Sequence, residues 1–283
     1  MLPDAHRFVE LPDGRCHFRL KGSDDAPVVL LLHGATVPGW EFDRLQPFLV
    51  NGGYRTLCPD LYGHGYSDRP PVTHNQALFV HQVEALLEAL EITQLAAVIG
   101  HSLGASVAAH FAARHPGQLR RLVMTAPLLN FEAIQPAMRL LRTPLLGELL
   151  IHSCVVPMLK RRRQKRYLPI EDGRFARMYE DQFRVKGFGR SLLSLIRSGA
   201  LGNQAAAYRQ LAASRLPTLL LRGGDDVIFD AAQLAEICTL LPHARVQEFA
   251  GMGHPMMLTH PEAVGPVIVE FVSNTSTDDH RQA

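Results

Sequence analysis

The chain contains few cysteines, little excess charge and no long uninterrupted apolar run. Its four cysteines among 283 residues are widely spaced and form no C-x-x-C pair, which argues against a zinc site and against a disulfide scaffold. The formal net charge is only +2, which excludes a general attraction to nucleic acid. The cysteines are Cys16, Cys58, Cys154 and Cys238.

Neither a membrane span nor a secretory leader is indicated. Positions 140–159 form the longest apolar region, but Arg142, Glu148 and two prolines interrupt it, whereas a span needs about 18 nearly continuous apolar residues. The first 19 residues lack a basic segment followed by an apolar core and a cleavage site. We therefore expect a cytoplasmic protein.

Short runs rich in Val, Leu and Ile alternate with helical stretches, and 47% hydrophobic residues suffice for a large core. Apolar strands that alternate with helices predict an α/β fold, with a mostly parallel central sheet flanked by helices. Two runs around the turn PDGR predict an antiparallel hairpin at the sheet edge. The expected strands span residues 6–10, 15–20, 28–32, 54–59, 95–100, 119–126, 216–223 and 244–250, and the expected helices span 75–90, 103–115, 230–241 and 261–272.

One long region interrupts this alternation. Residues 130–213 contain amphipathic helical patterns, separated by prolines and glycines, and no convincing strand. So long an insertion between two strands predicts a helical lid over one end of the sheet. We expect an α/β core formed by residues 1–129 and 214–273, the lid at 130–213, and a disordered polar tail at 274–283.

A glycine-flanked serine follows the apolar stretch LAAVIG. Gly100 and Gly104 bracket Ser102, and the alanine-rich ASVAAHFAARH predicts a helix directly after it. A sharp strand-to-helix turn needs both glycines, because its backbone is strained and passes close to neighbouring elements. Such a turn lifts the serine hydroxyl to the carboxyl edge of the sheet, where open α/β folds bind ligands. Ser102 is therefore the candidate nucleophile.

A serine hydroxyl needs a general base to act as a nucleophile. Of the 14 histidines, His254 lies in a loop between a predicted strand and a predicted helix, which we expect at the same sheet edge. His254 is the best candidate. His260 at the start of the next helix and His243 in a turn are weaker alternatives.

A carboxylate is expected to hold the imidazole in one tautomer and to stabilise its protonated form. The segment LLLRGGDDVIFD offers three aspartates after a strand. We favour Asp226 because of its G-x-x-D placement and keep Asp225 as the alternative. Asp230 directly precedes a predicted helix, where it suits an N-cap.

The order Ser102, Asp226, His254 matches that of the α/β-hydrolase superfamily, which the sequence resembles from about Arg15 to Val272. LLLHGATVPGW resembles its oxyanion loop, CPDLYGHGYSDRP its D-x-x-G-x-G-x-S segment, and GHSLG its nucleophile elbow. The resemblance implies an oxyanion hole formed by two backbone N–H groups. These belong to Ala35 and Leu103.

Several histidines accompany these motifs. We expect His33 and His64, which stand beside glycines, to make structural hydrogen bonds rather than to act in catalysis. Together with His101 and Asp60 they lack a metal-ligand spacing such as H-E-x-x-H. No metal site is therefore expected.

The resemblance implies a serine hydrolase that needs no cofactor. Ser102 would attack a carbonyl carbon while His254 removes its proton, and water would then release the acid from the acyl-enzyme. GHSLG followed by Ala105 is closest to lipase-like and carboxylesterase-like members, and GFGRSLLSLIRSGAL resembles monoacylglycerol-lipase-like ones. We expect a small-molecule carboxylic ester, of acyl or acylglycerol type. Because fold does not set function, a thioesterase, a lactonase, a cofactor-free peroxidase and a small-molecule receptor are the alternatives.

A basic run, Lys160–Arg166, follows the apolar stretch of the predicted lid. It is compatible with a rim that meets an anionic lipid surface or an acyl carrier protein. A solvated helix face is the commoner source of such a run.

Overall fold

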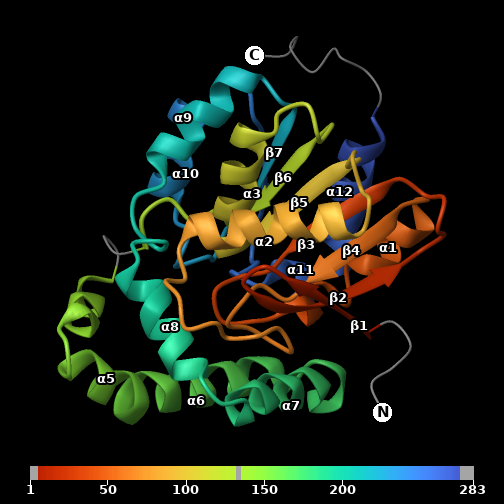
Figure 1. The fold of residues 1–283 in the computed structure, drawn as a ribbon. Helices are drawn as coiled ribbons and strands as arrows, with labels where there is room; N and C mark the ends of the chain where they lie inside the picture. Colours follow the sequence, from red (N-terminus) through yellow and green to blue (C-terminus); the bar gives the residue numbers. More distant parts are fainter. Residues whose placement is uncertain (1–5, 132–134, 275–283) are drawn as a thin grey trace.

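The computed structural model describes residues 6–131 and 135–274. Their strands form one eight-stranded sheet in the order β1-β2-β4-β3-β5-β6-β7-β8 (Figure 1). The strands are β1 (His6–Leu11), β2 (Gly14–Lys21), β3 (Val28–Leu32), β4 (Arg55–Pro59), β5 (Ala97–His101), β6 (Leu122–Thr125), β7 (Thr218–Gly223) and β8 (Arg245–Phe249).

The pairing of these strands confirms the predicted fold class. β1 and β2 form an antiparallel hairpin at one edge, and β2 also pairs antiparallel with β4. All other neighbours are parallel. Each of the eight predicted strands is present with small differences at its ends. Of the predicted disordered tail only Asn274 is described, so that prediction lies outside the described residues.

The sheet buries a separate apolar cluster on each face. Leu30 and Leu32 of β3 belong to one cluster, and Val29 and Leu31 belong to the other. Successive side chains of a strand point to opposite faces, so a strand covered on both sides must be apolar throughout. This requirement explains the continuous Val and Leu runs in the sequence.

Helices cover both faces of the sheet. Side chains of α2 (Gln76–Ala89), α3 (Leu103–Arg114), α9 (Ala205–Ser214) and α10 (Ala231–Leu240) enter the first cluster. Those of α1 (Gln46–Asn51), α11 (Met256–Thr259) and α12 (Pro261–Ser273) enter the second. The Asn75 side chain caps α2, and Asp230 caps α10 as predicted, each by accepting a backbone N–H at 2.9 Å.

The described residues between β6 and β7 form helices and loops but no strand. Aromatic residues of this region, Tyr167, Phe175 and Tyr179, pack on Val37 and Trp40 of the loop after β3. Figure 1 shows α5, α6 and α7 together along one side of the molecule, while α9 packs on α3. The elements are η2 (Pro136–Arg142), α5 (Leu146–Leu150), η3 (Ile151–Val155), α6 (Val156–Tyr167), η4 (Glu171–Gly173), α7 (Arg174–Asp181), η5 (Gln182–Arg184), α8 (Phe188–Arg197) and α9.

Within the described ranges, no helix is both long enough and apolar enough to cross a membrane.

One further short helix, η1 (Gly39–Phe42), follows β3. This helix contacts β3 and β4, and its Trp40 packs on Tyr167 and Phe175 of the β6–β7 region. Its residue Glu41 belongs to the candidate active site described below.

Candidate active site

Ser102 lies on a strained turn between β5 and α3. Its φ of 52° and ψ of −113° fall where residues with a side chain rarely occur. Backbone hydrogen bonds hold it there, because its N–H donates to the carbonyl of Thr125 at 3.0 Å and its carbonyl accepts from Ala105 at 3.1 Å. The predicted strand-to-helix turn is present.

The glycines of GHSLG are explained by close backbone approach. A Cβ on Gly104 would lie 2.0 Å from the carbonyl oxygen of Leu32 in β3. One on Gly100 would lie 2.6 Å from Cα of Ala105 in α3. Neither contact is possible for a residue with a side chain, so α3 can start beside the sheet only with glycine at both positions.

Asp226 and His254, 28 residues apart, form a buried pair. The Nδ1 of His254 lies 2.7 Å from Oδ2 of Asp226. The other carboxylate oxygen, Oδ1, accepts the backbone N–H groups of Ile228 and Phe229 at 2.8 and 3.0 Å. Both carboxylate oxygens are hydrogen-bonded, so the acid is fixed in place and orients the imidazole through Nδ1. The other ring nitrogen, Nε2, is then free to accept a proton.

Burial alone would raise the pKa of Asp226, but the hydrogen bond and charge of His254 and the two backbone N–H groups outweigh it. The pKa of Asp226 therefore lies below its ordinary value, and the carboxylate stays ionised at neutral pH. The alternative Asp225 is exposed.

The imidazole of His254 lies beside the elbow. Its ring centroid is 4.7 Å from that of His101, the residue directly before Ser102. Ser102 and His254 are both buried, 8% and 7% exposed. Two other histidines lie elsewhere: His260 precedes α12 and bonds Thr259, and His243 bonds the Leu216 carbonyl.

The loop after β3 approaches the same serine. A Cβ built on Gly34 would lie 3.6 Å from Cβ of Ser102. His33 accepts the N–H of Leu61 at Nε2, 2.8 Å away, so its Nδ1 carries the proton and donates to the carbonyl of Gly34 at 2.8 Å. Because C=O and N–H point in opposite directions across a trans peptide, this bond aims the Ala35 N–H away from His33.

His33 and His64 make hydrogen bonds to the backbone, as predicted. Burial lowers the pKa of His33 to about 3, with a further lowering by the neighbouring His64, so His33 is neutral at ordinary pH. The Nε2 of His64 lies 2.7 Å from the Ala35 carbonyl. Across the described part of the chain, no group of three or more His, Cys, Asp or Glu residues could hold a metal ion.

A buried acid that sequence analysis did not identify links the loop after β3 to the end of β5. Glu41 of η1, 2% exposed, accepts the N–H of Gly34 with Oε2 at 3.0 Å. Its Oε1 lies 3.5 Å from Nε2 of His101, whose Nδ1 bonds the Thr125 hydroxyl at 3.0 Å. A single glutamate in a short helix has no local signature, so only an unusually apolar setting around Trp40 and Phe42 could have drawn attention to it.

A serine on a strand-to-helix turn and an acid–imidazole pair in loops of a parallel sheet are the arrangement of the α/β class of hydrolases. The model of the alpha/beta hydrolase family matches residues 29–266, and the chain belongs to that family.

Relatives in this family carry different activities in their names. The chain is 28% identical to a non-heme chloroperoxidase of Streptomyces lividans, with 89% of this chain and 94% of the relative covered. It is 26% identical to a cis-3-alkyl-4-alkyloxetan-2-one decarboxylase of Shewanella oneidensis, covering 98% and 91%. The crystal structure of the haloalkane dehalogenase DbeA from Bradyrhizobium elkani USDA94 has the same fold, with a TM-score of 0.79, 24% identity, and 94% and 97% covered.

Proposed function

We propose that the protein is a serine hydrolase that cleaves a carboxylic ester, of acyl or acylglycerol type, through an acyl-enzyme on Ser102. The observation that carries this proposal is the 2.7 Å bond between Asp226 and His254, with the His254 ring in contact with His101, directly before a serine held at positive φ. A nucleophile, a base and a residue that orients the base are the parts that acyl transfer needs.

In the proposed reaction His254 Nε2 takes the proton of the Ser102 hydroxyl as its oxygen attacks the ester carbonyl. Asp226 stabilises the imidazolium that forms. The N–H groups of Ala35 and Leu103 donate to the developing oxyanion, and each such donor is worth about 3 kcal/mol. His254 returns the proton to the leaving alcohol, then activates the water that hydrolyses the acyl-enzyme.

The test is a panel of ester, thioester, lactone and aminoacyl substrates on wild type, Ser102→Ala and Ser106→Ala. Ser106 is a buried serine of α3, the helix that begins directly after Ser102, and its hydroxyl bonds the Leu128 carbonyl, so it is a matched control. We expect turnover and labelling by a serine-directed fluorophosphonate in wild type and Ser106→Ala only. Labelling that survives Ser102→Ala would remove Ser102 from the role.

A cofactor-free peroxidase is the second candidate, because the relative from Streptomyces lividans is named a chloroperoxidase. Perhydrolysis would use the same serine, with peroxide in place of water as the acceptor. Products from acetate, peroxide and bromide would separate the two: bromination at a rate above ester hydrolysis supports the peroxidase.

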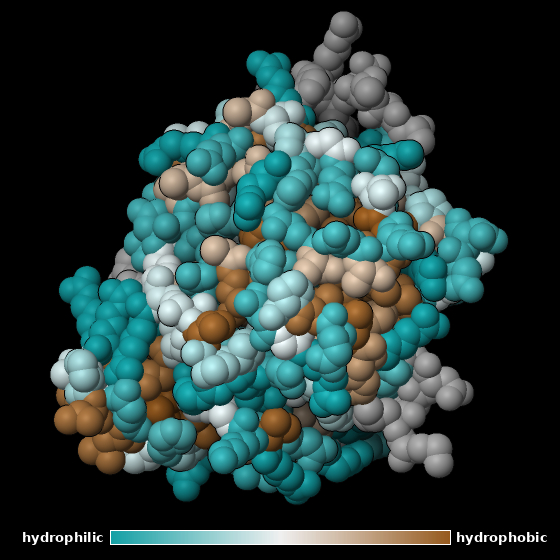
Figure 2. Space-filling model, viewed as in Figure 1, coloured by the Kyte–Doolittle hydropathy of each residue, from teal (hydrophilic) through white to brown (hydrophobic). Residues whose placement is uncertain are grey.

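The β6–β7 region carries an exposed apolar surface at α5, which precedes the basic run of α6 in the chain. Leu145 and Leu149 are 85% and 64% exposed, and Figure 2 shows hydrophobic side chains gathered over α5. Arg161 and Arg162 of α6 are exposed as well. Exposed apolar residues beside basic ones suit insertion into an anionic lipid surface, and we propose that the region, acting as a lid, makes this contact.

Sedimentation with phosphatidylserine and with phosphatidylcholine vesicles tests the membrane contact. We expect binding to the anionic vesicles, lost both in Leu145→Ser/Leu149→Ser and in Arg161→Gln/Arg162→Gln. Val246→Ser, on the edge strand β8, is the control for loss of an exposed apolar side chain. Binding of an acidic acyl carrier protein in place of vesicles, unaffected by the leucine changes, would assign the basic run to that partner instead.

A further inference from the structure

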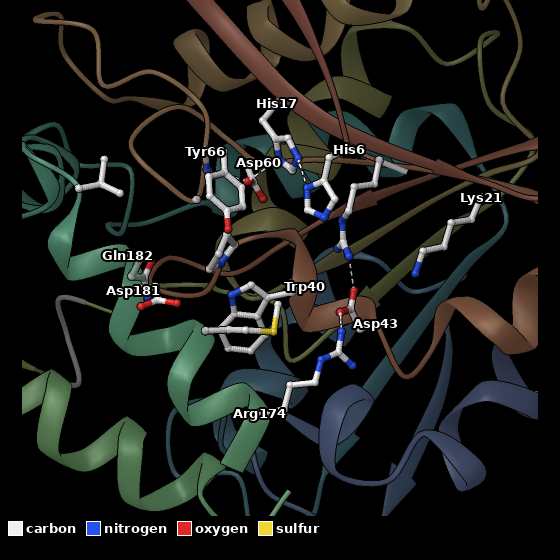
Figure 3. A pocket seen from close by; sticks show the side chains of 15 residues that line it. His6, His17, Lys21, Trp40, Asp43, Asp60, Tyr66, Arg174, Asp181 and Gln182 are labelled. Carbon is white, nitrogen blue, oxygen red and sulfur yellow. Dashed lines mark hydrogen bonds and ion pairs between the residues drawn. The ribbon is translucent and has the colours of Figure 1, made fainter. Parts of the chain in front are cut away.

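A cavity lined by both charged and apolar side chains lies between the β1–β2 hairpin and α7. Its volume is about 320 Å³, at the lower end of the range for small-molecule sites, about 300–1,000 Å³. Figure 3 shows side chains of the hairpin, of η1, of the loop after β4 and of α7 around it. Among the described residues that line it, none is Ser102, Asp226 or His254. It is therefore separate from the proposed catalytic groups.

The two buried carboxylates of the cavity wall are already compensated. Asp60 accepts Nδ1–H of His17 at 2.7 Å and the backbone N–H groups of Gly39 and Tyr66 at 2.8 and 2.9 Å. Asp43 lies in contact with the buried guanidinium of Arg19 and 3.2 Å from Arg174. Neither acid is left to attract a cation into the cavity.

Several polar groups of the lining have no partner among the described residues, and apart from the amide oxygen Oε1 of Gln182 they are donors. The ammonium of Lys21, the indole N–H of Trp40 and the hydroxyl of Tyr66 line the cavity without a hydrogen bond to any described residue. Figure 3 shows the Lys21 side chain extended toward the side of the cavity where Asp43 lies. Burial lowers the pKa of Lys21, and the nearby charge of Asp43, which is already paired with Arg19, offsets this only in part. A third carboxylate of the lining, Asp181, pairs with Arg184 at 2.9 Å. Lys21 is therefore left without an ion pair to any described residue.

Two hydrogen-bonded histidines, His17 and His6, add a further polar side chain to the cavity wall, the imidazole of His6. Because Nδ1 of His17 donates to Asp60, its Nε2 is an acceptor, and Nδ1 of His6 lies 2.8 Å from it. The two rings stack, with centroids 4.9 Å apart. His6 is thereby kept in one orientation in the cavity (Figure 3).

The remaining wall is apolar. Trp40 is 7% exposed and packs on Phe175 of α7, and Met178 of the same helix lines the cavity with it. We propose that the cavity binds a small organic carboxylate, whose acid group pairs with Lys21 and whose apolar body lies on Trp40 and Met178. One uncompensated ammonium matches one negative charge, so a carboxylate fits better than a phosphate dianion.

Trp40 makes the experiment specific, because it is the only tryptophan of the chain. Its fluorescence is followed while the whole protein is titrated with hexanoate and benzoate, with the neutral hexanamide and benzamide, and with inorganic phosphate. We expect a saturable change with the carboxylates and binding at least about tenfold weaker with the amides, since about 1.4 kcal/mol is lost with the charge pair. Equal binding of amides and carboxylates, or saturation by phosphate alone, would overturn the proposal.

Lys21→Met keeps the length of the side chain and removes its charge. We expect carboxylate binding about tenfold weaker in this variant and unchanged in the control Lys165→Met, which alters an exposed lysine of α6 that does not line the cavity. Unchanged binding in Lys21→Met would place the carboxylate elsewhere, including the proposed active site. The titration measures binding without turnover, so its outcome does not depend on whether the protein hydrolyses esters. If Lys21→Met does not fold, the comparison of carboxylates with amides on the wild-type protein still tests the proposal.

Discussion

At the scale of single residues, neighbouring carboxylates in the loop after β7 do different work because their surroundings differ. Asp226 is buried against His254, whereas Asp230 caps α10. Sequence analysis distinguished the two by position, since a cap must directly precede its helix, and the Asp230 cap is confirmed. The same reasoning could not find Glu41, whose partners Gly34 and His101 come from the loop after β3 and from the end of β5.

Substitution of the two aspartates should affect different properties: turnover for Asp226 and stability for Asp230. If the proposed triad is correct, Asp226→Asn lowers kcat by about 10⁴-fold, because the amide favours the wrong imidazole tautomer. Asp230→Ala should leave kcat intact and cost about 1 kcal/mol of unfolding free energy. Ester hydrolysis and urea unfolding measure both effects, and a fully active Asp226→Asn would contradict the role given to that residue.

Glu41 should act as a positioning residue for the oxyanion loop. Glu41→Ala removes the acceptor of the Gly34 N–H, and we expect kcat to fall about tenfold or more with KM nearly unchanged, short of the 10²–10³ that loss of a donor costs. Glu41→Gln keeps an acceptor for that N–H and should recover part of the rate. A purely structural role would instead lower the yield of folded protein in both variants and leave kcat per folded molecule unchanged.

At the scale of elements, the elbow depends on how closely α3 approaches the sheet. The glycine spacing and the apolar run before it were sufficient to predict the turn, because both requirements are local. The contact that forbids a side chain at Gly104 is not local, since it comes from the carbonyl of Leu32 in the neighbouring strand β3.

Gly104→Ala should therefore destabilise the protein by about 3 kcal/mol or more, because the added methyl group meets backbone that cannot move aside. Gly117→Ala is the matched control: nothing lies within 4 Å of its Cβ position, and alanine there should be neutral or stabilise by about 0.4–1 kcal/mol through the unfolded chain. Urea unfolding midpoints give both numbers. Equal stability of the two variants would show that the close approach is not required.

At the scale of the whole molecule, buried neutral histidines link stability to pH. Burial lowers the pKa of His33 to about 3, that of His74 to about 4, and that of His64 below its ordinary value. In the unfolded chain these groups take up protons below about pH 6.5. The folded state is thus favoured above that pH and loses stability as the pH falls toward the folded pKa values.

His33 and His74 should each contribute a slope of up to about 1.4 kcal/mol per pH unit between roughly pH 6 and 4. His74→Gln removes one such proton and should flatten the dependence by that amount, whereas His152→Gln, at an exposed position, should not change it. The measurement is the unfolding free energy from urea titrations at several pH values. An unchanged slope in His74→Gln would mean that His74 does not bind its proton on unfolding.

The order of strands and helices, the turn at Ser102 and the choice of Asp226 and His254 followed from the sequence alone. Each depends on a periodicity, a glycine spacing or the order of motifs along the chain, and such features are local or sequential. Tertiary structure alone decided that Glu41 bridges the loop after β3 and His101, and that Lys21, Trp40 and Tyr66 line one cavity without a hydrogen bond to any described residue. Those outcomes depend on which distant segments meet and which charges they neutralise, and no pattern along the chain encodes that balance.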